Sequence, residues 1–169
     1  MEKIDKIELF YEKAYEIVKE IFDGVTDKGG KPYLEHCLFV SRESLLGVYE
    51  YADKYSYDIR TVSMLAQIIG LLHDVIEDSK DWDEEKLKDI FGEFVSDRVK
   101  ILTRDIPSYD DYIQRIIDSG DIITLVVKRS DLIHNMDVTR LKVLTDKDLS
   151  RIKKYHKAYM QIDEKISML

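Results

Sequence analysis

The chain has 169 residues, of which 44% are hydrophobic, and this predicts a single domain, residues 1–169, with a substantial core. Its formal net charge of −8 argues against broad binding to nucleic acid, and its one cysteine, Cys37, excludes an intramolecular disulfide and indicates a reducing compartment. The charged N-terminus lacks a signal-peptide core and no run approaches the about 18 apolar residues that span a bilayer, so we expect a cytoplasmic protein without a membrane partner.

The first half of the chain predicts long helices, because few turn residues interrupt it. Apolar residues recur at helical spacing over about 4–22, and Gly24 ends this helix. A glycine-containing loop follows, and Pro32 stands where the first residue of a helix tolerates proline. The second helix is therefore expected over about 33–51, with His36 in its first turn.

The third predicted helix covers about 59–74 and is nearly all apolar over 62–72. An element that is apolar on most sides is buried. We therefore expect this to be the central helix of the fold, with the pair His73 and Asp74 at its C-terminal end.

The rest of the chain predicts five more helices, over about 83–91, 93–102, 108–117, 122–136 and 147–166. The short β-branched run 122–127 is by itself also compatible with a strand. Because apolar positions continue through Leu132 and Met136, a helix is favoured. The fold class is thus predicted to be all-α, a single helical bundle.

The strongest chemical signal is a group of four polar residues in the stretch 71–78. His73, Asp74, Glu77 and Asp78 directly follow the apolar run. Residues i and i+4 share a face of a helix, so His73 is expected to align with Glu77, and Asp74 with Asp78. Charges buried without partners cost several kcal/mol, and such groups usually pair or bind a metal. The sequence therefore predicts a divalent metal site with spare carboxylates beside it.

Other polar residues stand in a fixed order around this group. His36 comes first, at a helix start, and Asp131 with Asn135 one turn later comes last. His134 is expected to point away from the face that Asp131 and Asn135 share. The order of a His, a His-Asp pair and a late Asp resembles that of the HD superfamily of metal-dependent phosphohydrolases.

Within this superfamily, three motifs resemble those of the RelA/SpoT-type alarmone hydrolases in particular. Residues 30–36 are similar to their Gly-x-Pro-Tyr-x-x-His segment, and residues 73–78 match His-Asp-x-x-Glu-Asp. Residues 128–135 are similar to Lys-x-x-Asp-x-x-x-Asn. The resemblance covers about 14–141. Because the chain leaves no room for synthetase and regulatory domains, it resembles the stand-alone small alarmone hydrolases.

The resemblance implies four metal ligands: His36, His73, Asp74 and Asp131. Two imidazoles and two carboxylates suit a divalent first-row ion with open positions, and the family uses Mn²⁺. Such a cation lowers the pKa of bound water and neutralises phosphate charge. The resemblance also makes Glu77 and Asp78 the candidates for positioning or deprotonating the attacking water.

Four substrate-binding residues are implied as well: Lys28, Lys31, Lys128 and Asn135. The implied reaction is hydrolysis of the 3′-pyrophosphate of ppGpp or pppGpp, which gives GDP or GTP and pyrophosphate. The partner is thus a small nucleotide and no nucleic acid, and the sequence predicts no particular oligomeric state.

Two other functions fit the same residues. In the family the loop before Pro-Tyr carries Arg-Lys, whereas this chain has Asp27 followed by Lys28. Losing a cation that can stack on a base favours, as one alternative, a nucleotidase or phosphatase that acts on another nucleotide. The other alternative is a non-enzymatic nucleotide sensor or interaction module, although every expected ligand type is present.

Overall fold

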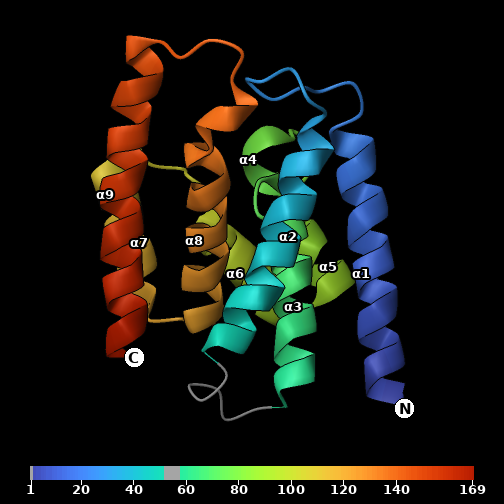
Figure 1. Cartoon of the computed structure of the whole chain (residues 1–169). Helices are drawn as coiled ribbons and strands as arrows, with labels where there is room; N and C mark the ends of the chain where they lie inside the picture. The colour runs from blue at the N-terminus through green and yellow to red at the C-terminus, as the bar shows by residue number, and fades with distance from the viewer. Residues whose placement is uncertain (1, 52–57) are drawn as a thin grey trace.

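The computed structural model describes residues 2–51 and 58–169, which form helices joined by loops (Figure 1). The first half contains four helices: α1 (Glu2–Ile21), α2 (Tyr33–Glu50), α3 (Ile59–Leu72) and the single turn α4 (Val75–Asp78). The second half contains α5 (Glu84–Phe91), α6 (Glu93–Leu102), α7 (Tyr109–Ser119), α8 (Ile122–Met136), the 3-10 turn η2 (Val138–Arg140) and α9 (Asp146–Met168). The predicted all-α fold is confirmed, and the ambiguous run 122–127 is helical.

Side chains at the helix ends explain several boundaries. Asp83, Ser108 and Thr145 each accept a hydrogen bond from a backbone N–H in the first turn of the helix that follows. Pro32 lies just before α2 with ψ 131°, so it precedes the helix instead of forming its first residue.

The helices form a bundle in which α2 lies between α3 and α8. It packs against α3 and α8, while α1 packs on α3 and α9 on α8. Figure 1 shows α5, α6 and α7 behind this row, and the loops after α1 and after α8 at the same end. Cys37 is fully buried in the core, as expected of a free cysteine on an apolar face.

The central helix α3 is apolar because it is buried. Among the described residues, the stretch Ile59–Asp78 is long and apolar enough by composition to cross a membrane, which the sequence analysis did not anticipate. However, 56% of its most apolar window is buried inside the protein. Its composition is therefore explained by its place in the core.

Helices α2 and α3 approach closely at Gly70. A Cβ atom on Gly70 would lie 2.9 Å from the Cα atom of Ser41. The Ser41 hydroxyl donates to the carbonyl of Gln67 across the same contact, at 3.0 Å. Because His36 precedes Ser41 on α2 and His73 follows Gly70, this contact brings the two imidazoles to the same end of the bundle.

Replacing Gly70 with alanine is expected to lower the free energy of unfolding by about 1–3 kcal/mol, because the added methyl group must push two packed backbones apart. Urea denaturation followed by circular dichroism measures the change. Arg60→Ala, at an exposed position of the same helix, is the control and should change the value by less than about 0.5 kcal/mol. Equal stabilities of the two variants would contradict the close-contact argument.

The predicted end of the third helix is wrong by two residues. α3 ends at Leu72, and His73 and Asp74 form a turn before α4. The ring Nδ1 of His73 bonds back to the carbonyl of Gly70 at 2.8 Å, which fixes the ring at the helix end. Both side chains face one site, since Nε2 of His73 lies 2.9 Å from Oδ2 of Asp74.

Candidate metal and nucleotide site

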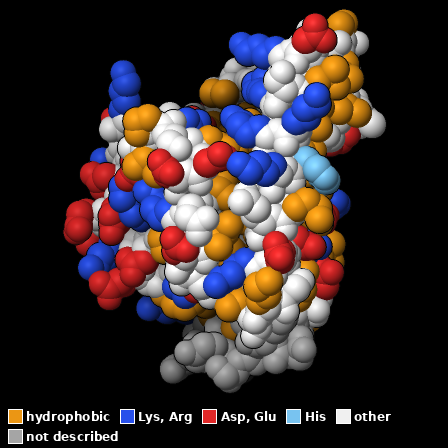
Figure 2. Space-filling model, turned by 90° about the vertical axis from the view of Figure 1, so that its left-hand side faces the viewer, with side chains coloured by type: hydrophobic (Ala, Val, Ile, Leu, Met, Phe, Trp, Pro, Cys, Tyr) orange, Lys and Arg blue, Asp and Glu red, His pale blue; other side chains and the backbone are white. Residues whose placement is uncertain are grey.

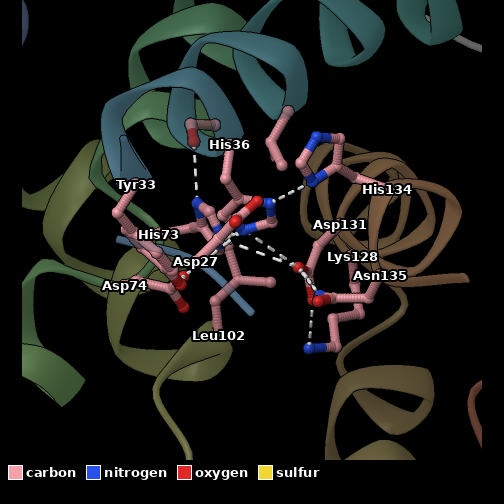
Figure 3. A network of polar contacts seen from close by, with 12 residues as sticks. Asp27, Tyr33, His36, His73, Asp74, Leu102, Lys128, Asp131, His134 and Asn135 are labelled. Carbon is pink, nitrogen blue, oxygen red and sulfur yellow. Dashed lines mark hydrogen bonds and ion pairs between the residues drawn. The ribbon is translucent and has the colours of Figure 1, made fainter. Parts of the chain in front are cut away.

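Four side chains from different elements converge at one end of the bundle (Figure 3). The Nε2 atom of His36 lies 3.3 Å from Nε2 of His73, 3.3 Å from Oδ1 of Asp131 and 3.6 Å from Oδ2 of Asp74. The Nε2 atom of His73 lies 2.9 Å from the same Asp74 oxygen and 3.8 Å from the Asp131 oxygen. All four residues singled out from the sequence as metal ligands are therefore brought together.

These separations fit donor atoms around one cation. Bonds of about 2.0–2.2 Å to a divalent ion place neighbouring donors roughly 3.0–3.5 Å apart. Ligand atoms of His36, His73 and Asp74 all lie within 4.8 Å of one another. Because Nδ1 of His73 donates to the Gly70 carbonyl, its Nε2 lone pair is left for a metal. The group can thus hold a divalent cation.

The electrostatics of the site favour positive charge. Burial raises the pKa of Asp74 and Asp131, but nearby cationic and hydrogen-bonding groups outweigh it, and both values lie well below the usual range. Burial lowers the pKa of His36 and His73, yet the two carboxylates outweigh it and raise the pKa of His73 to about 10. A cation placed between these carboxylates meets the same attraction.

Both carboxylates are held by further side chains. The Tyr33 hydroxyl donates to Oδ2 of Asp74 at 2.5 Å. The Lys128 ammonium donates to Oδ2 of Asp131 at 2.7 Å, and the Asn135 amide donates to Oδ1 of Asp131. Lys128 and Asn135, predicted as substrate contacts, therefore both bind and orient a candidate metal ligand.

The chain resembles known proteins in both sequence and structure. No family model matches the chain. Over 151 residues, 84% of this chain, it is 30% identical to the guanosine-3′,5′-bis(diphosphate) 3′-pyrophosphohydrolase of Borreliella burgdorferi. The match covers 20% of that protein, so the chain spans about a fifth of the length of this curated relative.

A solved structure shows the fold. It is that of a metazoan ortholog of SpoT that hydrolyses ppGpp, and it aligns with a TM-score of 0.66 and 16% identity over 94% of this chain and 92% of that chain. The chain has the HD-domain fold. The resemblance to the RelA/SpoT-type hydrolases that the motifs indicate is thereby confirmed.

The acidic pair Glu77 and Asp78 lies on α4, which directly follows the candidate ligands His73 and Asp74. Oε2 of Glu77 accepts a hydrogen bond from the backbone N–H of Arg104 at 2.9 Å. Partial burial raises the pKa of Asp78 to about 6, and the Asp74 carboxylate adds to this shift while His73 opposes it. Asp78 thus lies within electrostatic reach of the ligands, whereas Glu77 is tied to the loop after α6.

The two loop lysines lie in different surroundings. Lys28 lines a cavity beside the metal site, together with Asn135. The Lys31 ammonium lies 3.9 Å from Glu35, and its side chain is 60% exposed. The structure therefore brings Lys28 to the site but directs Lys31 toward the surface of α2.

Sequence reasoning missed most of the cations near the site. Burial and the Arg151 guanidinium lower the pKa of Lys28, while burial followed by Arg104, Arg151 and Lys128 lowers the pKa of Lys154. We call this group of mutually repelling cations the basic cleft: Lys28 and Arg151 line the cavity, and Arg104, Lys128 and Lys154 complete the group. In Figure 2, viewed from the α9 side, Lys and Arg side chains gather beside the hollow in the upper part of the molecule.

A helical spacing was the only signal for the α9 part of this cleft. Arg151 and Lys154 are three residues apart and so share a face of α9. Arg151 and Tyr155 line the cavity. The sequence does not say which face of α9 turns toward α8, so it could not assign these cations to the site.

The expectation for His134 is wrong. Its ring is 8% exposed, and its Nδ1 atom lies 2.7 Å from Nδ1 of His36. Residues i, i+3 and i+4 share a helix face, so His134 lies on the same side of α8 as Asp131 and Asn135. Burial, followed by His36 and Arg140, lowers the pKa of His134 to about 4, so the ring is neutral at neutral pH.

Asp27 is an internal anchor of its loop. Its Oδ2 atom accepts from Arg140 at 2.6 Å, and its Oδ1 atom accepts from the N–H groups of Gly29 and Lys31 at 2.8 and 3.0 Å. The side chain is 6% exposed. Burial raises the pKa of Asp27, but these bonds outweigh it, and the group stays ionised inside an ion pair.

Proposed function

We propose that this HD domain hydrolyses the 3′-pyrophosphate of ppGpp or pppGpp and releases pyrophosphate with GDP or GTP. The observation that carries the proposal is the position of the four-ligand site beside the basic cleft. In a chain of net charge −8, such a local gathering of cations indicates a small ligand with several phosphates. The similarity to a ppGpp 3′-pyrophosphohydrolase supports the guanosine substrate.

We further propose Mn²⁺ as the cation, held by His36, His73, Asp74 and Asp131. When bound, this cation supplies charge neutralisation at the phosphate and lowers the pKa of water. The mixed set of nitrogen and oxygen donors suits such a first-row ion. The protein's own contribution is to hold the donors in place through Tyr33, Lys128 and Asn135.

The proposed base is Asp78, because its raised pKa of about 6 leaves a carboxylate at neutral pH that is more basic than an ordinary one. Water attacks the phosphorus that is bonded to the ribose 3′ oxygen. The bond between this phosphorus and the 3′ oxygen then breaks. Asp78 takes a proton from the water, and the 3′ oxygen is protonated from solvent. Glu77 fixes the backbone of Arg104 at the edge of the basic cleft.

The basic cleft is proposed to hold the phosphate chains of the nucleotide. Asn135 belongs both to the cavity wall and to the hydrogen bonds of Asp131, so it joins the two parts of the site. Tyr155 offers an aromatic face in the same wall. Lys31 is left out of the proposed contacts because its ammonium faces Glu35.

The alternative of another nucleotide substrate rested on Asp27. Because Arg140 and two backbone amides bind this carboxylate, it presents no free negative charge to the cavity. The presence of an acid at position 27 therefore gives no support to a different nucleotide.

The decisive experiment incubates purified protein and Mn²⁺ with a panel of ppGpp, pppGpp, GTP, dGTP and AMP, and separates the products by anion exchange. The expected result is equimolar pyrophosphate and GDP from ppGpp. Cleavage only of the ordinary nucleotides would instead support a nucleotidase. Bound metal with no hydrolysis of any compound would support a sensor.

Lys154→Met is expected to raise the KM for ppGpp about tenfold or more without changing Mn²⁺ affinity, because it removes one charge-assisted contact from the basic cleft. Steady-state kinetics and a Mn²⁺ titration measure the two effects. Lys157→Met is a matched control on α9, since its ammonium pairs with Asp110 at 2.9 Å, whereas the Lys154 ammonium lies 5.2 Å from the ring of Tyr155 in the cavity wall. Equal KM values for both variants would remove Lys154 from the substrate contacts.

A further inference from the structure

The hydrogen bonds of His36 identify which of its nitrogens carries a hydrogen. Its Nε2 atom faces the donor atoms of His73 and Asp131 and must offer a lone pair if it binds a cation. Its Nδ1 atom then carries the hydrogen and donates it to Nδ1 of His134 at 2.7 Å (Figure 3). A metal-binding imidazole is commonly fixed in this way through its second nitrogen.

His134 is the acceptor of two donors at once. The Arg140 guanidinium also donates to Nδ1 of His134, and it donates to the carbonyl of the same residue at 2.6 Å. A ring nitrogen on which two N–H groups converge can hold no hydrogen of its own. The ring is confined on its other side by Phe39, whose centroid lies 4.4 Å away. Both the tautomer and the orientation of His134 are thereby determined.

Arg140 connects this pair of histidines to the loop that carries Lys28. Its second terminal nitrogen donates to Asp27 at 2.6 Å, and the side chains of Arg140 and Asp27 are 14% and 6% exposed. The loop also packs directly on η2, because a Cβ atom on Gly29 would lie 2.3 Å from the carbonyl oxygen of Arg140. Asp27 is thus connected to His36 by direct contacts through Arg140 and His134.

We propose that His134 and Arg140 are positioning residues for the metal site, and that Asp27 links the Lys28 loop to the same network. His134 and Arg140 hold His36 in the tautomer and orientation that a cation requires. Loop and cation site are therefore coupled: releasing the loop weakens cation binding. This inference rests on the proposed metal site but not on the identity of the nucleotide.

The affinity of the protein for Mn²⁺ tests the proposal without any substrate. Electron paramagnetic resonance measures the free Mn²⁺ during a titration and so gives this affinity. His134→Phe keeps a flat ring against Phe39 but removes the acceptor, and is expected to weaken Mn²⁺ binding about 10–100-fold. His134→Gln returns an acceptor oxygen and is expected to lie closer to the wild type. This rescue distinguishes positioning from mere filling of space.

Two guanidinium variants test the connection to the loop. Arg140→Met breaks the contacts to both His134 and Asp27 and is expected to weaken Mn²⁺ binding. Arg151→Met is the matched control, because Arg151 lines the same cavity but pairs with Asp148 instead. Its Mn²⁺ affinity is expected to equal that of the wild type. Asp27→Asn should weaken binding in the same direction as Arg140→Met.

The outcomes separate this inference from the proposed function. Wild-type Mn²⁺ affinity in a folded His134→Phe variant would overturn the positioning role. If that variant does not fold, equal affinities of Arg140→Met and Arg151→Met overturn it instead. A wild-type protein that binds no Mn²⁺ would reject the metal site itself. Normal Mn²⁺ binding without ppGpp cleavage would reject only the substrate.

Discussion

Replacing Asp131 with alanine is expected to abolish cation binding and hydrolysis together. The change removes one donor oxygen and also leaves the Lys128 ammonium, which is 8% exposed, without its carboxylate partner. An unpaired buried charge repels the incoming cation and destabilises the fold by about 3–5 kcal/mol. We expect Mn²⁺ affinity to fall by more than roughly 100-fold, since even groups that only support ligands contribute 10–100-fold.

A double variant separates the two consequences of that change. Asp131→Ala with Lys128→Met removes the stranded ammonium, so the free energy of unfolding should largely recover while Mn²⁺ binding and activity stay lost. Denaturation, calorimetric Mn²⁺ titration and a pyrophosphate-release assay measure the three properties. An Asp131→Ala protein that still binds Mn²⁺ as the wild type does would remove Asp131 from the ligand set.

Asp78→Asn is expected to leave Mn²⁺ bound and to lower kcat by about 10²–10⁴-fold, the usual contribution of a general base. The amide has nearly the same shape but accepts no proton. Glu77→Gln is the comparison, because its amide oxygen can still accept from the Arg104 N–H, and a smaller loss is expected. Full activity of Asp78→Asn in the presence of bound Mn²⁺ would show that another group takes the proton.

The same carboxylate predicts the pH dependence of the rate. With its pKa raised to about 6, Asp78 is a carboxylate above that pH and is protonated below it. Only the carboxylate accepts a proton, so kcat/KM should rise with pH and level off. A neighbouring bound cation lowers the pKa of a carboxylate, so the rise is expected at or below pH 6. A kcat/KM that shows no rise with pH anywhere below pH 6 would contradict this assignment.

The helices and the four candidate ligands could be predicted from the order of the amino acids. Apolar spacing sufficed for α6 and α8, whose bounds agree with the prediction, because burial of one face dictates a period close to that of the helix. The four candidate ligands were implied by the resemblance of residues 30–36, 73–78 and 128–135 to known motifs. Apolar spacing did not show that α3 ends before His73, because such a pattern locates the end of a helix only to within a residue or two.

The surroundings of the candidate ligands depend on contacts between segments that are far apart in the sequence. Arg140 and Asp27 are 113 positions apart in sequence, and His36 and His134 are 98 apart, yet each pair is joined by a hydrogen bond. Whether Arg151 faces the site depends on how α9 is rotated about its axis relative to α8. The packing of the whole core determines this rotation. A helical sequence specifies which residues share a face, but the neighbouring helices decide what that face meets.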